Sequence, residues 1–258
     1  MNFDPMITLH RLVMRQFEGV TLYNSDCLEM LNVECDAVIT DPPYGIRHSS
    51  SHGASWADTE IENDHSMEAR DAVWNYHRDK PRAMFGSWKQ PAPPECRGVL
   101  VYDKGDAGSG DLSFPWKPSW EEIYVAGKGW AGKRDRAILQ GPQMTTWETG
   151  AGHDGKNGRL HPHEKPVWVM ARLIEKLPAN FVILDPFMGS GTTIIACLRL
   201  GRKCVGIEKD PKHYATAVER IGRELQQGVL LPHNDGTQRP GDAEATNETR
   251  ATPPGSLE

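Results

Sequence analysis

The chain has 258 residues, of which 38% are hydrophobic, so it is long enough for one sizeable domain with a small insertion. No run reaches the roughly 18 to 20 apolar residues of a membrane span, and the first residues lack the apolar core of a signal peptide, so we expect a cytoplasmic protein. The formal net charge of −6 argues against a uniformly basic nucleic-acid binder, and five cysteines without C-x-x-C spacing argue against a disulfide framework or a zinc site.

Hydrophobic periodicity predicts strands and helices that alternate along most of the chain. Strands are expected at 20–24, 36–40, 82–87, 99–102, 120–126, 181–184 and 203–207. Helices are expected at 26–31, 67–77, 167–177, 192–200 and 210–225. This alternation is typical of an α/β fold.

The regions between and after these elements differ in composition. Residues 1–231 carry the α/β pattern and form one predicted domain, in which the polar stretch 45–63 is expected to be a mobile loop. Residues 128–160 are rich in glycine, tryptophan and basic residues, which predicts a small inserted target-recognition region; a solvated basic loop is the alternative. Residues 232–258 contain no aromatic residue and are predicted to form a disordered tail.

A stiff turn follows the predicted strand at 36–40. It consists of Asp41, Pro42, Pro43 and Tyr44, and the carboxyl ends of strands are where α/β sheets bind ligands. Two successive prolines fix φ near about −65° and remove two N–H donors, so the carbonyl groups of the turn stay free to accept hydrogen bonds. Asp41 and the Pro42 carbonyl can each accept one N–H of an exocyclic amine while Tyr44 stacks on a planar base. A structural turn with a capping Asp and a packed Tyr is the alternative.

A second motif lies between a predicted strand and a predicted helix. Residues 185–193 read Asp-Pro-Phe-Met-Gly-Ser-Gly-Thr-Thr, in which Gly189 and Gly191 permit a tight turn and a threonine can cap the helix. The motif lacks both the lysine of a P-loop and the third glycine of a dinucleotide fingerprint. Glu208 ends the next strand, where a carboxylate can accept the hydroxyls of a ribose. A glycine loop that begins with Asp185 therefore indicates a nucleoside cofactor with a cationic, amine-bearing group.

Together these motifs resemble those of amino-methyltransferases that act on DNA. Residues 185–193 look like the S-adenosylmethionine loop of that family, and residues 40–45 look like its catalytic motif. The catalytic motif comes first, and residues 161–166 match the His-Pro-x-x-Lys-Pro motif that precedes the cofactor loop in the circularly permuted β class. The resemblance spans roughly 20–225. It implies a Rossmann-like class I methyltransferase fold, circularly permuted, in which helices cover both faces of a mostly parallel twisted sheet.

The resemblance also implies a site. It assigns catalysis to the turn Asp41, Pro42, Pro43 and Tyr44. It assigns S-adenosylmethionine to Asp26, Cys27, Asp41, His161, Lys165, Asp185, Phe187, Gly189, Ser190, Gly191, Thr192, Thr193 and Glu208. No metal is implied.

Within this set the resemblance distributes the parts of the cofactor. Asp185 and the glycine loop would line the methionine end, with His161 and Lys165 near the methionine carboxylate. Glu208 would take the ribose, and Asp26 the adenine, with Cys27 beside it; a simple helix cap is the alternative for Asp26. Two further stretches, Tyr102-Asp103-Lys104 and Trp120-Glu121-Glu122, resemble late family motifs without an assigned role.

The implied reaction is direct methyl transfer to an exocyclic nitrogen. Hydrogen bonds to Asp41 and to the Pro42 carbonyl favour a more tetrahedral amine, so the reaction depends on geometry rather than on a general base. A target amine inside a duplex requires base flipping. Transfer to carbon 5 of cytosine would need a cysteine nucleophile, usually after proline, and no cysteine follows a proline here.

Aspartate at the head of the catalytic motif favours adenine N6, because serine is commoner in the cytosine-N4 enzymes of this family; cytosine N4 stays the alternative. We expect a site-specific enzyme that acts on double-stranded DNA, either with a cognate restriction endonuclease or alone, in the bacterial cytoplasm or encoded by a phage. The order of the motifs argues against RNA. A catalytically silent DNA-binding partner subunit is the rival from another class. Relatives often form homodimers, and the candidates for phosphate or guanine contacts are Arg134, Arg136, Lys156 and Arg159.

Overall fold

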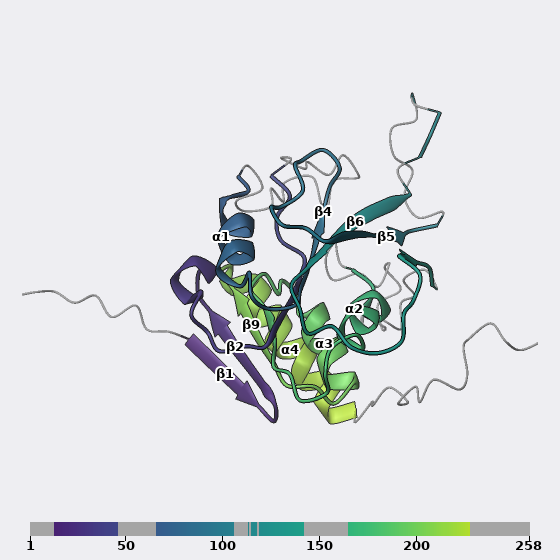
Figure 1. Cartoon of the computed structure of the whole chain (residues 1–258). Helices are drawn as coiled ribbons and strands as arrows, with labels where there is room; N and C mark the ends of the chain where they lie inside the picture. Colours follow the sequence, from purple (N-terminus) through teal and green to yellow (C-terminus); the bar gives the residue numbers. More distant parts are fainter. Residues whose placement is uncertain are drawn as a thin grey trace, which may run out of the picture.

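The computed structural model describes residues 13–45, 66–105, 113, 115–117, 119–141 and 165–227. Within them one sheet has the strand order β1-β2-β9-β8-β3-β4-β6-β5-β7 (Figure 1). Its strands are β1 (Val13–Phe17), β2 (Val20–Asn24), β3 (Ala37–Thr40), β4 (Arg82–Gly86), β5 (Gly98–Asp103), β6 (Trp120–Ala126), β7 (Ile138–Leu139), β8 (Ile183–Asp185) and β9 (Cys204–Glu208). The helices are the 3₁₀ helix η1 (Cys27–Met30), α1 (Glu68–Tyr76), α2 (Val167–Ile174), α3 (Thr192–Arg199) and α4 (Pro211–Gln227).

Five neighbouring strands run in parallel, from β2 through β9, β8 and β3 to β4. Strand β6 runs antiparallel between β4 and β5, and β1 runs antiparallel at the edge beside β2. The carboxyl ends of β3, β8 and β9 therefore share one edge of the sheet with the beginning of β6. This arrangement confirms the mostly parallel α/β fold.

Two apolar layers cover the faces of the sheet. Along β3, side chains alternate: Ala37 and Ile39 pack with α2, α3 and α4, whereas Val38 packs with α1 and η1 on the other face. Figure 1 shows α1 apart from the group formed by α2, α3 and α4. Fully burying a Val or Ile side chain stabilises the fold by about 1.5 to 3 kcal/mol, so strands buried on both faces favour this sandwich strongly. None of the helices in the described ranges is long and apolar enough to cross a membrane.

The direction of the chain changes between β8 and β3. From β8 the chain passes through α3 to β9 on one side, and from β3 it passes through α1 to β4 on the other. Because the two crossovers leave in opposite directions, the carboxyl ends of these adjacent strands form the switch point at which α/β sheets bind ligands. Asp185 ends β8, and Asp41 follows β3 directly.

Three features of the fold differ from the sequence-based expectation. Strand β7 lies in the region 128–160, where no strand was predicted, and it pairs with β5 at the edge of the sheet. Strand β1 was not predicted, because Val13 and Met14 are 49% and 51% exposed and the run has no consistently buried face. Helix α2 ends at Ile174 rather than at Leu177. Residues 46–65, 142–164 and 228–258 lie outside the described ranges, so the mobile loop, most of the predicted insert and the predicted tail stay predictions.

Gly206 of β9 is a position where packing requires glycine. A Cβ atom there would overlap the Met188 sulfur and lie 3.1 Å from side-chain carbons of Ile194 and Leu22. We predict that Gly206→Ala lowers the free energy of unfolding by about 1 to 3 kcal/mol, as overpacking does. Gly98→Ala in β5 is the control, because no atom lies within 4 Å of its added Cβ. Equal unfolding midpoints for the two variants in urea would contradict this packing.

Candidate active site

Four carboxylates stand in a row at the carboxyl edge of the sheet. Asp41 follows β3, Asp185 ends β8, Glu208 ends β9 and Asp26 follows β2, and these strands are direct neighbours. Adjacent strands lie about 4.8 Å apart, so the row extends over roughly 14 Å. This density of negative charge favours a ligand with cationic groups over a pyrophosphate.

Asp41 has a partner on each carboxylate oxygen. The Tyr44 hydroxyl donates to Oδ1 at 2.6 Å, and the Lys165 ammonium lies 2.8 Å from Oδ2. Burial raises the pKa of Asp41, while the charge of Lys165 acts in the opposite direction. Burial also raises the pKa of Tyr44, and the neighbouring Asp41 carboxylate adds to this effect, so the phenol stays protonated and donates.

Asp185 is more deeply buried than Asp41, with 2% of its surface exposed. Its Oδ1 accepts hydrogen bonds from Thr40 Oγ1 at 2.5 Å and from the Phe187 N–H at 3.1 Å. Burial raises the pKa of Asp185 to about 6, although the hydrogen bonds favour the ionised form. The Thr40 contact ties the end of β3 to the start of the glycine loop.

The glycine loop is held in shape from two sides. Gly191 adopts φ of 88° at the start of α3, a conformation that strongly favours glycine. From β9, Glu208 accepts the Gly189 N–H on Oε2 at 2.9 Å. From α4, the buried Arg220 donates to the Ser190 carbonyl at 3.3 Å and to Thr192 Oγ1 at 3.2 Å. The role of Arg220 was missed because a basic residue on an amphipathic helix is usually solvated.

Glu208 and Asp26 occupy the other end of the row. Glu208 also accepts the Asp210 N–H on Oε1 at 2.8 Å, and burial raises its pKa. Each carboxylate oxygen retains a second lone pair that can accept a hydroxyl group. Asp26 accepts the Leu28 N–H at 2.9 Å and pairs with Lys209 at 3.1 Å. These contacts make Asp26 a cap of η1, and its contact with the adenine of the cofactor stays a prediction.

No reactive thiol is apparent beside this row. Cys27 is buried, and burial raises its pKa to about 12, so the thiol is protonated at neutral pH. All five cysteines lie in the described ranges and are free of disulfides. Those ranges also contain no group of three His, Cys, Asp or Glu that could hold a metal ion.

Lys165 lies beside the turn that follows β3. Its side chain is 7% exposed, and its ion pairs join the carboxylates of Asp41 and Glu121. Glu121 in turn pairs with Lys104 at 3.2 Å. Burial acts to raise the pKa of Glu121, yet Lys165 and Lys104 together bring it below its ordinary value. The sequence contained both Lys104 and Glu121 in motifs of unknown role, and the fold joins them.

The remaining candidates divide between described and undescribed residues. Phe187 is half-buried and Thr193 is buried within the loop that the sequence predicted. His161, Lys156 and Arg159 lie outside the described ranges, whereas Arg134 and Arg136 are exposed.

Comparison with known proteins identifies the family. A family model described as DNA methylase matches residues 63–219, more than half of the chain. The chain belongs to this DNA methylase family. Its members are methyltransferases of adenine N6 or cytosine N4. The match begins after Asp41, so the assignment is independent of the catalytic turn.

Two curated relatives illustrate how this methylase compares in sequence. The YubD protein of Escherichia coli (strain K12), whose name as a methylase is provisional, is 27% identical over 213 residues, which cover 75% of this chain and 86% of YubD. Type II methyltransferase M2.LlaDCHI of Lactococcus lactis subsp. cremoris is 39% identical over 70 residues, which cover 27% of this chain and 26% of that enzyme.

Solved structures of other methylases share the fold. M1.HpyAVI, crystallised as a complex with SAM, gives a TM-score of 0.57 at 20% identity, covering 78% of this chain and 99% of that chain. The cytosine-N4-specific PvuII DNA methyltransferase gives a TM-score of 0.53 at 14% identity, covering 78% of this chain and 86% of that chain. These likenesses confirm the predicted Rossmann-like methyltransferase fold.

The buried Asp185 generates a prediction about charge. A carboxylate whose pKa is raised on folding destabilises the protein as the pH rises through the folded-state pKa, here about 6. Asp185→Asn removes this effect, so at pH 7.5 we predict an unfolding temperature equal to or above that of the wild type. If Asp185 holds a cationic group, the same variant should bind S-adenosylmethionine at least about tenfold more weakly, as the loss of a charged hydrogen bond implies.

Calorimetric titration at pH 5 and pH 7.5 provides the control for this prediction. Wild-type affinity for S-adenosylmethionine should fall at pH 5, where Asp185 is largely protonated. The affinity of Asp185→Asn should fall by less, because Asp185 no longer titrates and only other carboxyl groups of the row, such as Glu208, still respond to acid. A variant with unchanged affinity at pH 7.5 would exclude Asp185 from the cofactor site.

Proposed function

We propose that this methylase transfers the methyl group of S-adenosylmethionine to N6 of adenine in double-stranded DNA, by direct in-line attack after base flipping. The observation that carries the proposal is the juxtaposition of Asp41 and Asp185. They stand at the ends of adjacent parallel strands and are joined through the hydrogen bond from Thr40 to Asp185. A site for an amine and a site for a cationic cofactor therefore meet at the switch point of the sheet.

S-adenosylmethionine fits the residues along the row. The ammonium and sulfonium groups of this cofactor are cations, and Asp185 is a buried carboxylate beside the glycine loop. Glu208 has the acceptor capacity for a ribose diol, one strand farther along. Bound there, the cofactor supplies an electrophilic methyl group, and the protein supplies its orientation toward the amine.

Asp41 and its neighbours accept the target base. Asp41 and the Pro42 carbonyl accept the two N–H groups of the adenine amine, which localises the lone pair on nitrogen. Tyr44 stacks on the flipped base. Asp at this position favours adenine N6. Cytosine N4 is the second candidate, because the PvuII enzyme shares the fold and is cytosine-N4-specific.

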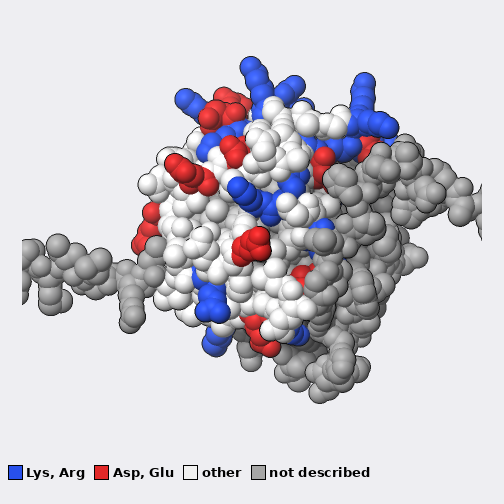
Figure 2. All heavy atoms as spheres, turned by 90° about the horizontal axis from the view of Figure 1, so that it is seen from below, with Lys and Arg blue, Asp and Glu red and all other residues white. Residues whose placement is uncertain are grey.

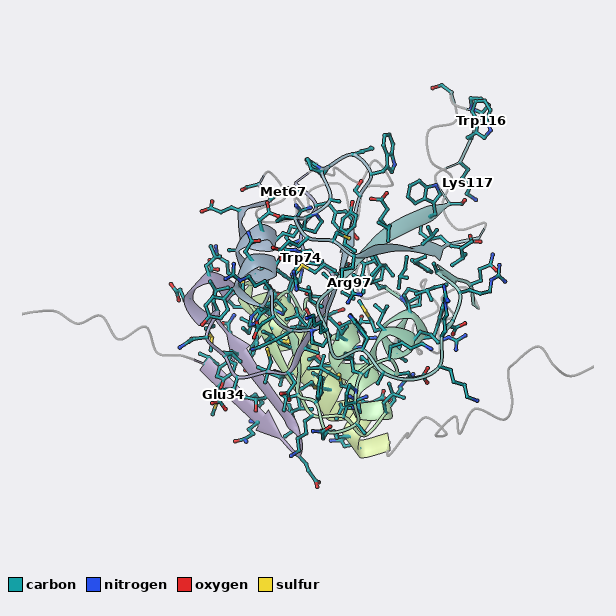
Figure 3. The ribbon with its side chains drawn as sticks, viewed as in Figure 1. Glu34, Met67, Trp74, Arg97, Trp116 and Lys117 are labelled. Carbon is teal, nitrogen blue, oxygen red and sulfur yellow. The ribbon has the colours of Figure 1, made fainter. Side chains whose placement is uncertain are left out.

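The edge of the site suits a nucleic acid. Trp88, 65% exposed, follows β4 beside Lys89, and Gln90 of the same turn donates to the Gly45 carbonyl at 2.9 Å. Trp116 and Lys117 project beyond β5 and β6 (Figure 3). Exposed indole rings stack on bases, and lysines neutralise phosphates. Seen from below, on the side away from this edge, basic and acidic side chains are interspersed (Figure 2).

The primary test is the identity of the product. The protein is incubated with S-adenosylmethionine carrying a labelled methyl group and with mixed duplex DNA, and the digested nucleosides are separated by mass spectrometry. Labelled N6-methyladenine supports the proposal, whereas N4-methylcytosine selects the second candidate. The absence of labelled product on duplex DNA, single strands and RNA would leave the silent partner subunit as the function.

The assigned role of Asp41 predicts a selective loss of rate. Asp41→Ala should retain S-adenosylmethionine binding but lose more than about a hundredfold in kcat, the scale of losing one essential hydrogen-bonding group. Asp79→Ala is the control, because Asp79 is exposed after α1 and away from the site. Turnover of Asp41→Ala at the wild-type rate would refute this role.

The exposed Trp88 predicts a selective loss of DNA affinity. Trp88→Ala should weaken duplex binding by about fivefold to a hundredfold, since stacking on one base contributes about 1 to 3 kcal/mol. Tyr76→Ala removes another exposed aromatic ring, 52% exposed at the end of α1, and should bind DNA like the wild type. Fluorescence anisotropy of a labelled duplex measures both, and equal affinities would remove Trp88 from the interface.

A further inference from the structure

The two partners of Asp41 compete with its proposed substrate. Tyr44 occupies Oδ1 and Lys165 occupies Oδ2, at 2.6 and 2.8 Å. A substrate amine that donates to Asp41 must displace one partner or share its oxygen. The partner that stays bound determines how the Asp41 carboxylate is held during the reaction.

Lys165 is held more firmly than Tyr44. Its side chain is 7% exposed, and its ammonium lies between the Asp41 carboxylate and Glu121 Oε2, which is 3.2 Å away. Separating a buried ammonium from two carboxylates is strongly unfavourable, whereas a neutral hydroxyl group gives up one hydrogen bond. The Tyr44 hydroxyl is therefore the more easily displaced of the two partners, and its ring is free to stack on a base once the hydroxyl has moved.

Glu121 extends the ionic contact across the sheet. Its Oε1 lies 3.2 Å from Lys104 Nζ, so charges alternate from Lys104 through Glu121 and Lys165 to Asp41 and sum to zero. Glu121 Oε2 makes no well-aligned hydrogen bond, so its contact with Lys165 is mainly electrostatic. The rings of Tyr44 and Phe85 lie 5.4 and 5.1 Å from the Lys165 ammonium and favour its charge.

We propose that Lys165, held by Glu121, is a positioning residue that keeps Asp41 ionised and leaves Oδ1 for the substrate amine, from which the Tyr44 hydroxyl withdraws when the base enters. This inference rests on the proposed function, because it takes Asp41 as the acceptor of the amine. It assigns Lys165 to the catalytic carboxylate instead of the cofactor carboxylate that its motif implies.

The groups that face Asp41 determine the expected pH dependence. They are Tyr44 of the same turn, Lys165 before α2, Glu121 of β6 and Asp185 of β8. Of these, Lys165 carries a positive charge, and the charge of Glu121 opposes ionisation of Asp41. Because burial already raises the pKa of Asp41, loss of the Lys165 charge raises it further.

Lys165→Met tests the role directly. The variant should lose at least about tenfold in kcat, with KM for DNA and Kd for S-adenosylmethionine within about threefold of the wild type, as expected for a group that acts mainly in the transition state. The acidic limb of its plot of kcat against pH should move to higher pH by about one unit or more. A nearby positive charge lowers a carboxyl pKa by about that amount, and this variant removes the charge. Lys165→Arg, which keeps the charge, should retain the wild-type limb.

Glu121→Gln and Lys176→Met complete the set. Glu121→Gln should lower kcat without moving the acidic limb upward, because the Lys165 charge remains. Lys176→Met removes the charge of a lysine that pairs with Asp135 at 3.7 Å near the surface, and should behave like the wild type. Unfolding temperatures identify variants that fail to fold. If Lys165→Met does not fold, the kcat profiles of Lys165→Arg and Glu121→Gln are compared with the wild type instead.

A double-mutant cycle separates the two roles of Lys165. If Lys165 acts through Asp41, adding Lys165→Met to Asp41→Asn should cause little further loss of kcat. If Lys165 binds the cofactor carboxylate, Lys165→Met should weaken S-adenosylmethionine binding equally in both backgrounds, which would overturn the inference. A wild-type protein that makes no methylated base refutes the proposed function, whereas normal turnover of Lys165→Met in an active methylase refutes this inference alone.

Discussion

Strands β3 and β8 are about 145 residues apart in the chain, yet they pair in parallel with Val38 opposite Leu184. This pairing places the turn that begins at Asp41 and the glycine loop at one edge of the sheet. Thr40 then locks the two together through its hydrogen bond to the buried Asp185. A shift of register by one residue would turn every side chain of β3 to the other face. The apolar layers on both faces of β3 therefore also fix where Asp41 stands.

The carboxylates of the site differ in how the protein balances their negative charge. Asp41 has a lysine partner within the protein, and Glu121 has two. Asp185 has hydrogen bonds from Thr40 and Phe187, and burial still raises its pKa to about 6. A cationic ligand stabilises the ionised form of such a buried carboxylate most strongly, because the ligand supplies the positive charge that the side chains around Asp185 do not. The Asp41 carboxylate is thus balanced within the protein, whereas Asp185 would be balanced by the cationic cofactor that we propose it binds.

The sequence was informative where function depends on contiguous residues. The turn after β3 and the loop after β8 each combine a strand end with proline or glycine, so the local pattern predicted where both lie, and the family resemblance supplied their expected roles. The parts that it did not reveal depend on distant residues. Glu121 reaches Lys165 from β6, and Arg220 reaches the glycine loop from α4. Strand β1 was not predicted from the sequence, because its pairing with β2, rather than burial of its side chains, stabilises it.

The contacts of Asp41 also explain how one carboxylate can serve a resting and a reacting state. Its Oδ2 belongs to a chain of four alternating charges whose central lysine, Lys165, is buried, so we expect the orientation of the carboxyl group to be fixed before a substrate arrives. Its Oδ1 is satisfied by the neutral Tyr44 hydroxyl, which an amine can replace with a hydrogen bond of similar strength. Because the exchange replaces one neutral donor with another, base entry leaves no buried acceptor unsatisfied. Asp41 Oδ2, which keeps its partner, is therefore held by an ion pair, and Oδ1, which we propose changes partner, is held by a hydrogen bond from a neutral group.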